Sequence, residues 1–394
     1  MKYAIIIPDG AADLPLAELD GRTPLQAAAK PTMDQVASMG KIGTVRTVPK
    51  GMAPGSDVAI LSLMGYNPKL IYTGRAPLEA AAQGLTVSPD EWIFRCNLVT
   101  IVDGLMEDYS AGHISSEEAR HLIKELNDKL QATGAKFHSG VGYRHLMMLA
   151  GEFEVATTPP HDILGQPADK HLPTGTGAER LIALMQRSQS ILAEHEVNAV
   201  RRDLGENPAS SIWLWGQGKM PTLESFRKKF GISAAVITAV DLVRGIAALA
   251  GMDRIEVEGA TGYIDTNYIG KGQAAVEALD DHDLVVVHVE ATDECGHNAE
   301  AVEKTKALEK IDRYIVAPVL KRLQQEGDQW RLLISPDHPT PCALRTHTGE
   351  PVPFAIAGKD ITTVLSTPFT EEAGLASDLH ITHGHELMEY FLKH

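Results

Sequence analysis

The first strand-like segment of the chain reads Tyr3-Ala-Ile-Ile-Ile7 and runs directly into Pro8-Asp9-Gly10. An apolar run with β-branched residues on both faces is typical of a strand in a parallel sheet that helices cover. The same pattern recurs later in the chain, at residues 234–240, 284–289, 331–334 and 353–357. Helical patterns such as residues 299–323 separate these segments. The alternation predicts an α/β fold with a mainly parallel central sheet covered by helices.

The middle of the chain has a different pattern. Residues 91–102 read as a strand, and residues 115–133 read as a helix that begins with the capping box Ser115-Ser116-Glu117-Glu118. Short strands and loops rich in Gly and Pro surround them, which indicates an α+β arrangement. We expect residues 76–207 to form a smaller inserted domain, and residues 1–75 and 208–394 to form a discontinuous core.

Composition and charge exclude several classes of protein. The 394 residues are 44% hydrophobic and 22% charged, which favours a large folded core over disorder. The net charge of −16 and the aromatic content of 5% argue against nucleic-acid binding. Three scattered cysteines fit a reducing cytosol, and no apolar run reaches the ~20 residues of a membrane helix. We expect a cytoplasmic protein with a small-molecule substrate. The composition is compatible with a monomer or a homo-oligomer.

Acidic and histidine side chains follow several of the predicted strands. In an open parallel sheet, ligands bind beyond the carboxyl ends of the strands, so these side chains should converge. Any one of them alone is better explained as a helix cap or a structural histidine, but together they favour a metal site. Carboxylate and imidazole ligands without thiolates suit Mn²⁺, Mg²⁺, Zn²⁺ or Co²⁺. The candidates are Asp9, Asp293, His297, Asp337, His338 and His347.

A serine stands at the start of an apolar helical pattern. In Ala53-Pro-Gly55-Ser56-Asp57, a tight turn delivers Ser56 to a predicted helix over residues 57–64. A helix N-terminus favours a bound phosphate, and coordination to a metal would make the hydroxyl a nucleophile. The alternative, which this segment alone favours, is that Ser56 only caps the helix. The metal candidates elsewhere shift the balance toward catalysis.

Taken in order, these motifs resemble a known family. Pro8-Asp9-Gly10, Pro54-Gly55-Ser56-Asp57, Asp293-x-x-x-His297, Asp337-His338 and Thr346-His347-Thr348 are similar to motifs of the alkaline phosphatase superfamily. They resemble more closely those of the archaeal type of cofactor-independent phosphoglycerate mutases, and the resemblance runs along the whole chain. It implies an alkaline-phosphatase-like core with an inserted lid domain.

The resemblance also implies a phosphotransferase with two metal ions, Mn²⁺ being the first expectation. Ser56 would take the phosphoryl group from 3-phosphoglycerate and return it to the 2-hydroxyl of glycerate. Paired cations ~3.5–4 Å apart would clamp the attacking and leaving oxygens, and the lid would exclude water. One ion would be held by Asp9, Ser56, Asp337 and His338, and the other by Asp293, His297 and His347.

A substrate with a carboxylate and a phosphate requires cations from the lid. Arginine suits this role because it binds both groups in a bidentate way, and Arg144, Arg201 and Arg202 are the candidates. His113 is the expected acid/base, and Lys219 is expected to approach the transferring phosphoryl group. The alternative for Arg144 and Arg202 is an ordinary place on the surface.

Other interpretations stay open beside the mutase. A homoserine kinase-like phosphotransferase of the same family would use the same metal core, since that core handles only the phosphoryl group. A phosphomonoesterase would result from a lid that admits water. A metal-binding protein without catalysis is disfavoured because every expected position is filled. The C-terminal histidines His380, His383 and His385 precede a helical pattern and lack carboxylate partners, so they indicate a helix entry.

Overall fold

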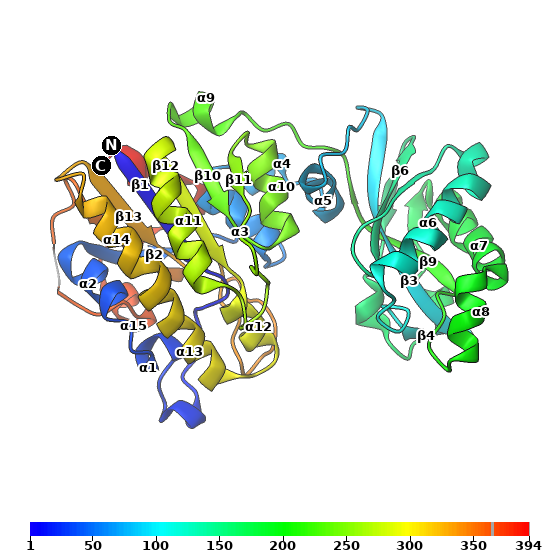
Figure 1. Cartoon of the computed structure of the whole chain (residues 1–394), viewed down its shortest axis with the longest axis horizontal. Coiled ribbons are helices and arrows are strands. Elements are labelled where there is room, and N and C mark those ends of the chain that lie inside the picture. The colour runs from blue at the N-terminus through cyan, green and yellow to red at the C-terminus, as the bar shows by residue number, and fades with distance from the viewer. Residues whose placement is uncertain (364–365, 394) are drawn as a thin grey trace. The chain divides into compact units, whose positions relative to one another are not determined.

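The computed structural model describes residues 1–363 and 366–393 and divides into two compact units (Figure 1). Unit 1 contains Met1–Tyr72 and the chain from Thr222 onward, and unit 2 contains Thr73–Pro221. Unit 2 therefore runs beyond residue 207, because strand β9 (Ser211–Gly218) pairs with β3 (Glu91–Val102) inside it. It also includes Lys219, which the sequence placed in the core.

Unit 1 is built on an eight-stranded sheet with the strand order β11-β10-β12-β1-β13-β14-β2-β15. Only β14 runs antiparallel to its neighbours, so the expected α/β fold with a mainly parallel sheet is confirmed. The strands are β1 (Lys2–Pro8), β2 (Lys41–Val45), β10 (Ala234–Ile237), β11 (Asp253–Ile255), β12 (Leu284–Val289), β13 (Trp330–Ile334), β14 (Val352–Gly358) and β15 (His380–Ile381).

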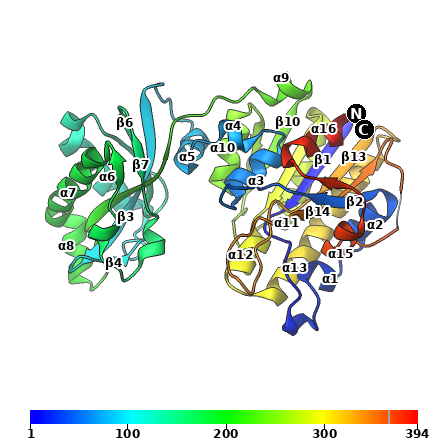
Figure 2. The same cartoon turned by 180° about the vertical axis from the view of Figure 1, so that it is seen from behind.

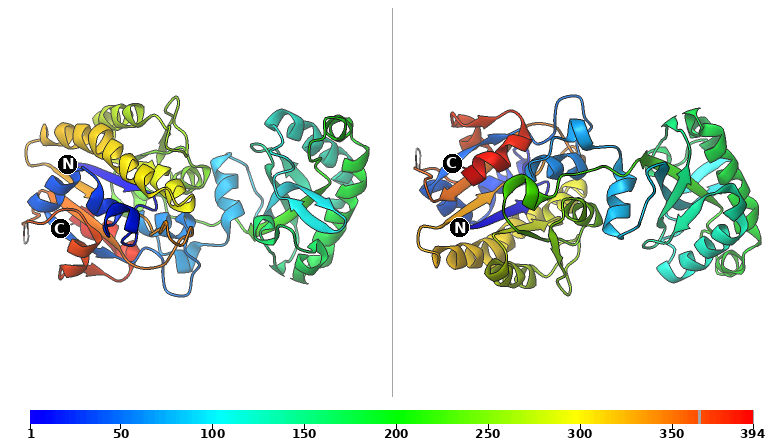
Figure 3. Two further views of the ribbon diagram at one scale, coloured as in Figure 1. Left: turned by 90° about the horizontal axis from the view of Figure 1, so that it is seen from below. Right: turned by 90° about the horizontal axis from the view of Figure 1, so that it is seen from above.

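Helices cover both faces of this sheet. Figure 1 shows α11 (Tyr268–Asp281), α13 (Ala301–Ile311) and α14 (Ala317–Gln324) on one face, and Figure 2 shows α3 (Ser56–Leu63) and α16 (Leu387–Lys393) on the other. Figure 3 shows these layers from two further directions. The central strands are buried on both sides, which is why they read as continuous apolar runs rather than as alternating ones. The remaining helices are α1 (Pro24–Ala27), α2 (Pro31–Met39), α4 (Pro68–Ile71), α9 (Phe226–Phe230), α10 (Asp241–Leu249), α12 (Ala291–His297) and α15 (Glu371–Ala376).

The helical pattern at residues 299–323 is interrupted in the structure. A π-helical turn at Asp312–Val316 separates α13 from α14. Pro318 explains part of this, because proline has no N–H to donate to the carbonyl of Tyr314, four residues earlier. Helix α11 packs tightly against that carbonyl, and Gly272 is needed there because a Cβ atom would collide with it.

Unit 2 has its own sheet and core. Antiparallel strands β4 (Leu105–Asp108), β6 (Arg144–Ala150) and β9 pair with β3, and β5 (Lys136–His138) pairs with β6. A second, two-stranded sheet joins β7 (Glu154–Ala156) and β8 (Thr174–Thr176). The helices are α5 (Arg75–Ala82), α6 (Ser116–Leu130), α7 (Ala178–Glu194) and α8 (Glu196–Asp203). The capping box is present, since the hydroxyl of Ser115 accepts from the N–H of Glu118 while the Glu118 carboxylate accepts from the N–H of Ser115.

Within the described ranges, the helices are too short or too polar to cross a membrane.

Candidate metal centre

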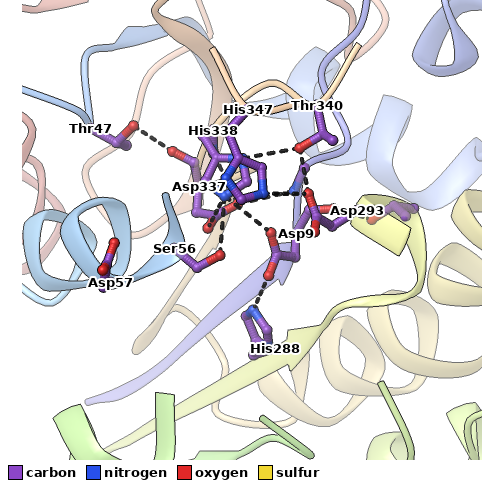
Figure 4. Close-up of polar contacts among 12 residues, drawn as sticks. Asp9, Thr47, Ser56, Asp57, His288, Asp293, Asp337, His338, Thr340 and His347 are labelled. Atoms are coloured by element: carbon purple, nitrogen blue, oxygen red, sulfur yellow. Dashed lines mark hydrogen bonds and ion pairs between the residues drawn. The ribbon is translucent and has the colours of Figure 1, made fainter. Parts of the chain in front are cut away.

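The carboxyl ends of β1, β12 and β13 bring the predicted ligands of unit 1 together (Figure 4). Asp9 follows β1, Asp293 lies on α12 just after β12, and Asp337 and His338 follow β13. The turn after β1 depends on glycine, because Gly10 has a φ of 60° and a Cβ atom there would collide with the Asp293 carboxylate. The Gly10 N–H donates to Asp337 Oδ1 over 3.0 Å, which ties two of the ligands to one turn.

The first group of ligand atoms consists of Asp293, His297 and His347. The Nε2 atom of His297 lies 3.2 Å from Asp293 Oδ2, and the Nε2 atom of His347 lies 3.4 Å from Asp293 Oδ1. The two Nε2 atoms lie 2.9 Å from each other. Two imidazole lone pairs this close repel, so a proton or a metal ion must lie between the two nitrogens. The hydrogen bond to Asp293 raises the pKa of His297 to about 9, which shows how strongly this point favours positive charge.

The second group forms around the Nε2 atom of His338. Asp9 Oδ1 lies 3.6 Å from it, Asp337 Oδ2 lies 3.3 Å from it, and Ser56 Oγ lies 3.1 Å from it. Asp9, Asp293 and His338 also form a compact set of ligand atoms, so Asp293 belongs to both groups. The family resemblance implied that Asp293 binds one ion. In the structure, its carboxylate is close enough to both groups of ligand atoms to belong to each.

The electrostatics of the centre require positive charge. Burial, and after it the charges of Asp337, Asp293 and Glu290, raises the pKa of Asp9 well above its ordinary value. Asp9 Oδ1 and Asp337 Oδ2 are buried and accept no hydrogen bond within the described part of the chain. Buried carboxylate oxygens without partners are costly, and a cation that they coordinate removes that cost. The donor set of carboxylates and imidazoles therefore fits two divalent ions.

Thr340 determines which nitrogen of His338 faces the centre. The Thr340 hydroxyl donates its single proton to Asp293 Oδ1 and lies 3.2 Å from His338 Nδ1. Toward His338 it can therefore only accept, so Nδ1 carries the ring proton and Nε2 keeps its lone pair. Burial lowers the pKa of His338, which keeps the ring neutral. The Nε2 lone pair faces Ser56, Asp9 and Asp337, as a metal ligand would.

The Thr340→Val variant tests this role. Removing the hydroxyl leaves Asp293 with one hydrogen bond fewer and His338 Nδ1 without its acceptor, so we expect metal affinity to fall about 10–100-fold. Titration of the metal-free protein with Mn²⁺ measures the change. Thr305→Val is a matched control, since in the described part of the chain the Thr305 hydroxyl donates only to the carbonyl of Ala301 within α13. Equal affinities in the two variants would contradict the role of Thr340.

His288 is part of the centre and was missed by the sequence analysis. It lies inside β12, fully buried, and its Nε2 lies 2.8 Å from Asp9 Oδ2. Its Nδ1 lies 3.1 Å from the hydroxyl of Thr238. Burial lowers the pKa of His288 to about 4, so a neutral ring donates from Nε2 to Asp9 and accepts at Nδ1. The available signal was a single histidine in the apolar strand Leu284-Val-Val-Val-His-Val289.

The Ser56 hydroxyl faces the ligand cluster and does not cap its helix. Gly55 is the N-cap of α3, and Ser56 is the first residue of the helix. Its hydroxyl makes no cap hydrogen bond and points toward His338 instead (Figure 4). The alternative that Ser56 only caps its helix therefore fails. Further along α3, the Ser62 hydroxyl donates to the carbonyl of Thr47 over 2.5 Å, and the Thr47 hydroxyl donates to the carbonyl of Asp337. These two bonds connect the serine helix to the ligand loop.

In unit 2, His113 ends a tightly bonded turn. The carboxylate of Asp108 accepts from the N–H groups of Ser110 and Gly112, and His113 itself has a φ of 51°. A left-handed conformation at a non-glycine residue is costly and persists where surrounding contacts enforce it. Because the His113 side chain is exposed at the end of this turn, it is available to a ligand.

Arg201 has internal partners. Its side chain is 3% exposed and forms ion pairs with Glu118 and Glu206, and it donates to the carbonyls of Ala111, Gly112 and Asn207. The guanidinium thus supports the turn that presents His113. The expectation that Arg201 binds substrate has no support from these surroundings.

The other predicted cations of unit 2 are more accessible. Arg144 and Arg202 are exposed, and the Arg144 guanidinium lies 5.8 Å from the ring centre of Tyr143. Arg202 donates to the carbonyl of Ala193 and has no carboxylate partner within the described residues. The Lys219 ammonium lies 5.5 Å from the ring centre of Trp92. The N–H groups of these three side chains can donate hydrogen bonds to an anion.

The fold and the centre together define a class: α/β enzymes that carry a serine hydroxyl beside paired sites for divalent ions at the carboxyl edge of the sheet. Comparison with known proteins narrows this class. The sequence profile of the family described as 2,3-bisphosphoglycerate-independent phosphoglycerate mutase matches residues 37–198. The mutase of that name from Methanothrix thermoacetophila is 47% identical over 392 residues, which cover 100% of both chains.

Two solved structures share the fold along nearly the whole chain. The PH0037 protein from Pyrococcus horikoshii superposes with a TM-score of 0.85 at 31% identity and covers 99% of this chain and 96% of its own. The cofactor-independent phosphoglycerate mutase from Thermoplasma acidophilum superposes with a TM-score of 0.69 at 28% identity, covering 100% and 99%. The chain belongs to the family of 2,3-bisphosphoglycerate-independent phosphoglycerate mutases.

Proposed function

We propose that this protein interconverts 3-phosphoglycerate and 2-phosphoglycerate through a phosphoserine at Ser56. The observation that supports this most is the Ser56 hydroxyl, which has no capping role and lies 3.1 Å from His338 Nε2 at the edge of the buried carboxylates. Family membership supports the substrate pair.

The proposed reaction has two transfers. In the first, the Ser56 hydroxyl gives its proton to solvent, Ser56 Oγ forms a bond to phosphorus, and the bond from phosphorus to the 3-oxygen breaks. In the second, the oxygen of the 2-hydroxyl forms a bond to phosphorus, the bond from phosphorus to Ser56 Oγ breaks, and Ser56 takes a proton back from solvent. Divalent ions bound at the centre would neutralise phosphate charge and lower the pKa of the Ser56 hydroxyl. The positive end of α3 also favours the phosphate.

Unit 2 is proposed to supply the remaining groups and to act as a water-excluding lid. His113 would protonate the leaving 3-oxygen and then accept the proton of the 2-hydroxyl, which leaves its charge unchanged over the cycle. Arg144 and Arg202 would bind the substrate carboxylate, and Lys219 would contact the phosphoryl group. The side chains of His113, Arg144 and Arg202 are exposed and that of Lys219 is half-buried, which supports the assignment.

Mn²⁺ is the proposed ion at both positions, with Mg²⁺, Zn²⁺ and Co²⁺ as alternatives that the same ligands accept. We place the reaction in the cytoplasm. The three cysteines support this setting because all are buried thiols rather than disulfides.

A paired assay tests the proposed substrate. Production of 2-phosphoglycerate from 3-phosphoglycerate, coupled to enolase without added 2,3-bisphosphoglycerate, is expected to be metal-dependent and at least ~10²-fold faster than any transfer from ATP to homoserine. The same protein incubated with 3-phosphoglycerate should release little inorganic phosphate. Turnover only with ATP and homoserine would replace the mutase by a homoserine kinase, and release of phosphate as the main product would replace it by a phosphomonoesterase.

A further inference from the structure

A cavity of about 660 Å³ in unit 1 has a lining unlike the rest of this acidic protein. Its size lies in the range of pockets that bind small organic molecules. Six of its fourteen lining residues are Arg, Lys or His, although the chain holds only 36 Lys and Arg and 16 His in 394 residues. The described lining includes no Asp or Glu. The basic residues are Arg46, Lys50, Lys69, His380, His383 and His385.

The two lysines of the cavity are available to a ligand. Lys50 follows β2 and Lys69 lies on α4, both side chains are exposed, and neither has an ion-pair partner among the described residues. Elsewhere in the chain, lysines such as Lys124 and Lys136 pair with carboxylates. The Arg46 guanidinium is oriented by a hydrogen bond that its Nη1 donates to the carbonyl of Gly349 over 2.6 Å, and its other N–H groups can donate to a ligand.

The rest of the lining mixes hydrogen-bonding and apolar groups. Thr382 and Asn67 contribute polar atoms, and Pro49, Pro351 and Leu375 contribute apolar surface. Leu375 is 65% exposed and forms part of the apolar surface of the cavity. A ligand that matches this wall has a charged anionic end and an apolar body.

The cavity is separate from the metal centre but shares a segment with it. None of the seven predicted metal ligands lines it. Its wall is formed in part by residues 46–50, which lead from β2 toward Ser56. Gly384 packs so closely against Arg46, Thr47 and Ser62 that a Cβ atom would collide with them. The C-terminal histidines thus do more than enter a helix, because they line this cavity beside that contact.

We propose that this cavity is a second ligand site, which binds a phosphate-bearing metabolite with an apolar or aromatic body. The phosphate would be bound by the lysines, Arg46 and the histidines, and the body would contact the proline and leucine wall. Burial lowers the pKa of His385, and the negative charge of a bound dianion would act in the opposite direction and favour the protonated ring.

Adenosine 5′-monophosphate is a suitable probe, because it has one phosphate and an aromatic body. Isothermal titration of the Mn²⁺-loaded full chain, with 3-phosphoglycerate at saturation to occupy the active site, should show saturable binding. Adenosine, which lacks the phosphate, should bind at least about tenfold more weakly. Absence of saturable binding up to about 10 mM, or equal binding of adenosine, would overturn the proposal.

Charge reversal locates the binding. The double variant Lys50→Glu/Lys69→Glu should weaken binding of the probe at least about tenfold, which corresponds to about 1.4 kcal/mol. Lys310→Glu/Lys321→Glu changes the net charge equally on the exposed sides of α13 and α14 and should leave the dissociation constant within about threefold. The single variant Lys69→Gln gives a milder version of the test if the double variant unfolds. Equal effects of the two double variants would show a general charge effect and overturn the site.

Discussion

Replacement of Ser56 by alanine is expected to lower kcat for the conversion of 3-phosphoglycerate at least ~10³-fold, because the variant has no group to carry the phosphoryl group. Metal content should stay close to that of the wild type, since Asp9, Asp337 and His338 remain beside the deleted hydroxyl. The loss should fall on kcat more than on KM, because the substrate groups that bind elsewhere are unchanged.

Two measurements complete this test. Steady-state kinetics gives kcat, and mass spectrometry of wild-type protein quenched in acid during turnover should find a phosphoryl group on Ser56. Ser62→Ala is the matched control on the same helix. It should keep activity within about tenfold because, among the described residues, the one hydrogen bond of its hydroxyl goes to the carbonyl of Thr47. Substantial turnover by Ser56→Ala, or a phosphoryl group on another residue, would contradict the serine nucleophile.

Asp293→Asn is expected to have an effect at least as large, about 10⁴-fold on kcat/KM. Among the residues that the structure describes, Asp293 is the carboxylate that both groups of ligand atoms share. Although burial acts to raise its pKa, hydrogen bonds from His297 and His347 hold the pKa of Asp293 well below its ordinary value, so the group is charged. Asparagine keeps the shape and removes the charge, and both ions should then bind more weakly.

Elemental analysis after dialysis measures this loss directly. Wild-type protein should retain about two ions per chain, and Asp293→Asn should retain fewer than one. Asp312→Asn is a suitable control, because Asp312 is also buried but accepts from Thr32 and Met33 at the start of α2, away from the metal ligands. If Asp293→Asn kept both ions, the shared position of this carboxylate would be wrong.

The positions of the ligands could be predicted because they depend on topology. Asp9, Asp293 and Asp337 each follow a strand of the parallel sheet, and the carboxyl ends of such strands meet at one edge. No knowledge of side-chain packing was needed for this. The i, i+4 spacing of Asp293 and His297 likewise follows from helix geometry.

The partners of these ligands could not be predicted in the same way. Nothing in the sequence around Thr340 or Thr47 marks these residues as functional. Their importance arises from the hydrogen bonds that they donate to Asp293 and Asp337 in the folded chain. His288 gave a signal, but a histidine in a strand is more often structural. That Asp293 belongs to both groups follows from distances between atoms in three dimensions, and the positions of residues along the chain do not give these distances.

Unit 2 shows the same limit. Arg201 and Arg202 are adjacent in sequence and look equally suited to bind an anion. Because one side of α8 is buried, the Arg201 side chain is enclosed by protein and the Arg202 side chain faces solvent. Arg201 is enclosed by Glu118 and Glu206, whereas Arg202 is exposed. Helical periodicity could have separated them only if the buried side of this short helix had been known.

Crystals grown with Mn²⁺ and measured at the manganese absorption edge give the most direct test of the whole account. We predict two anomalous difference peaks in each chain. One should lie among Asp293, His297 and His347, and the other among Asp9, Asp337 and His338 within coordination distance of Ser56 Oγ. A single peak, or peaks away from these side chains, would contradict a paired metal centre beside the serine.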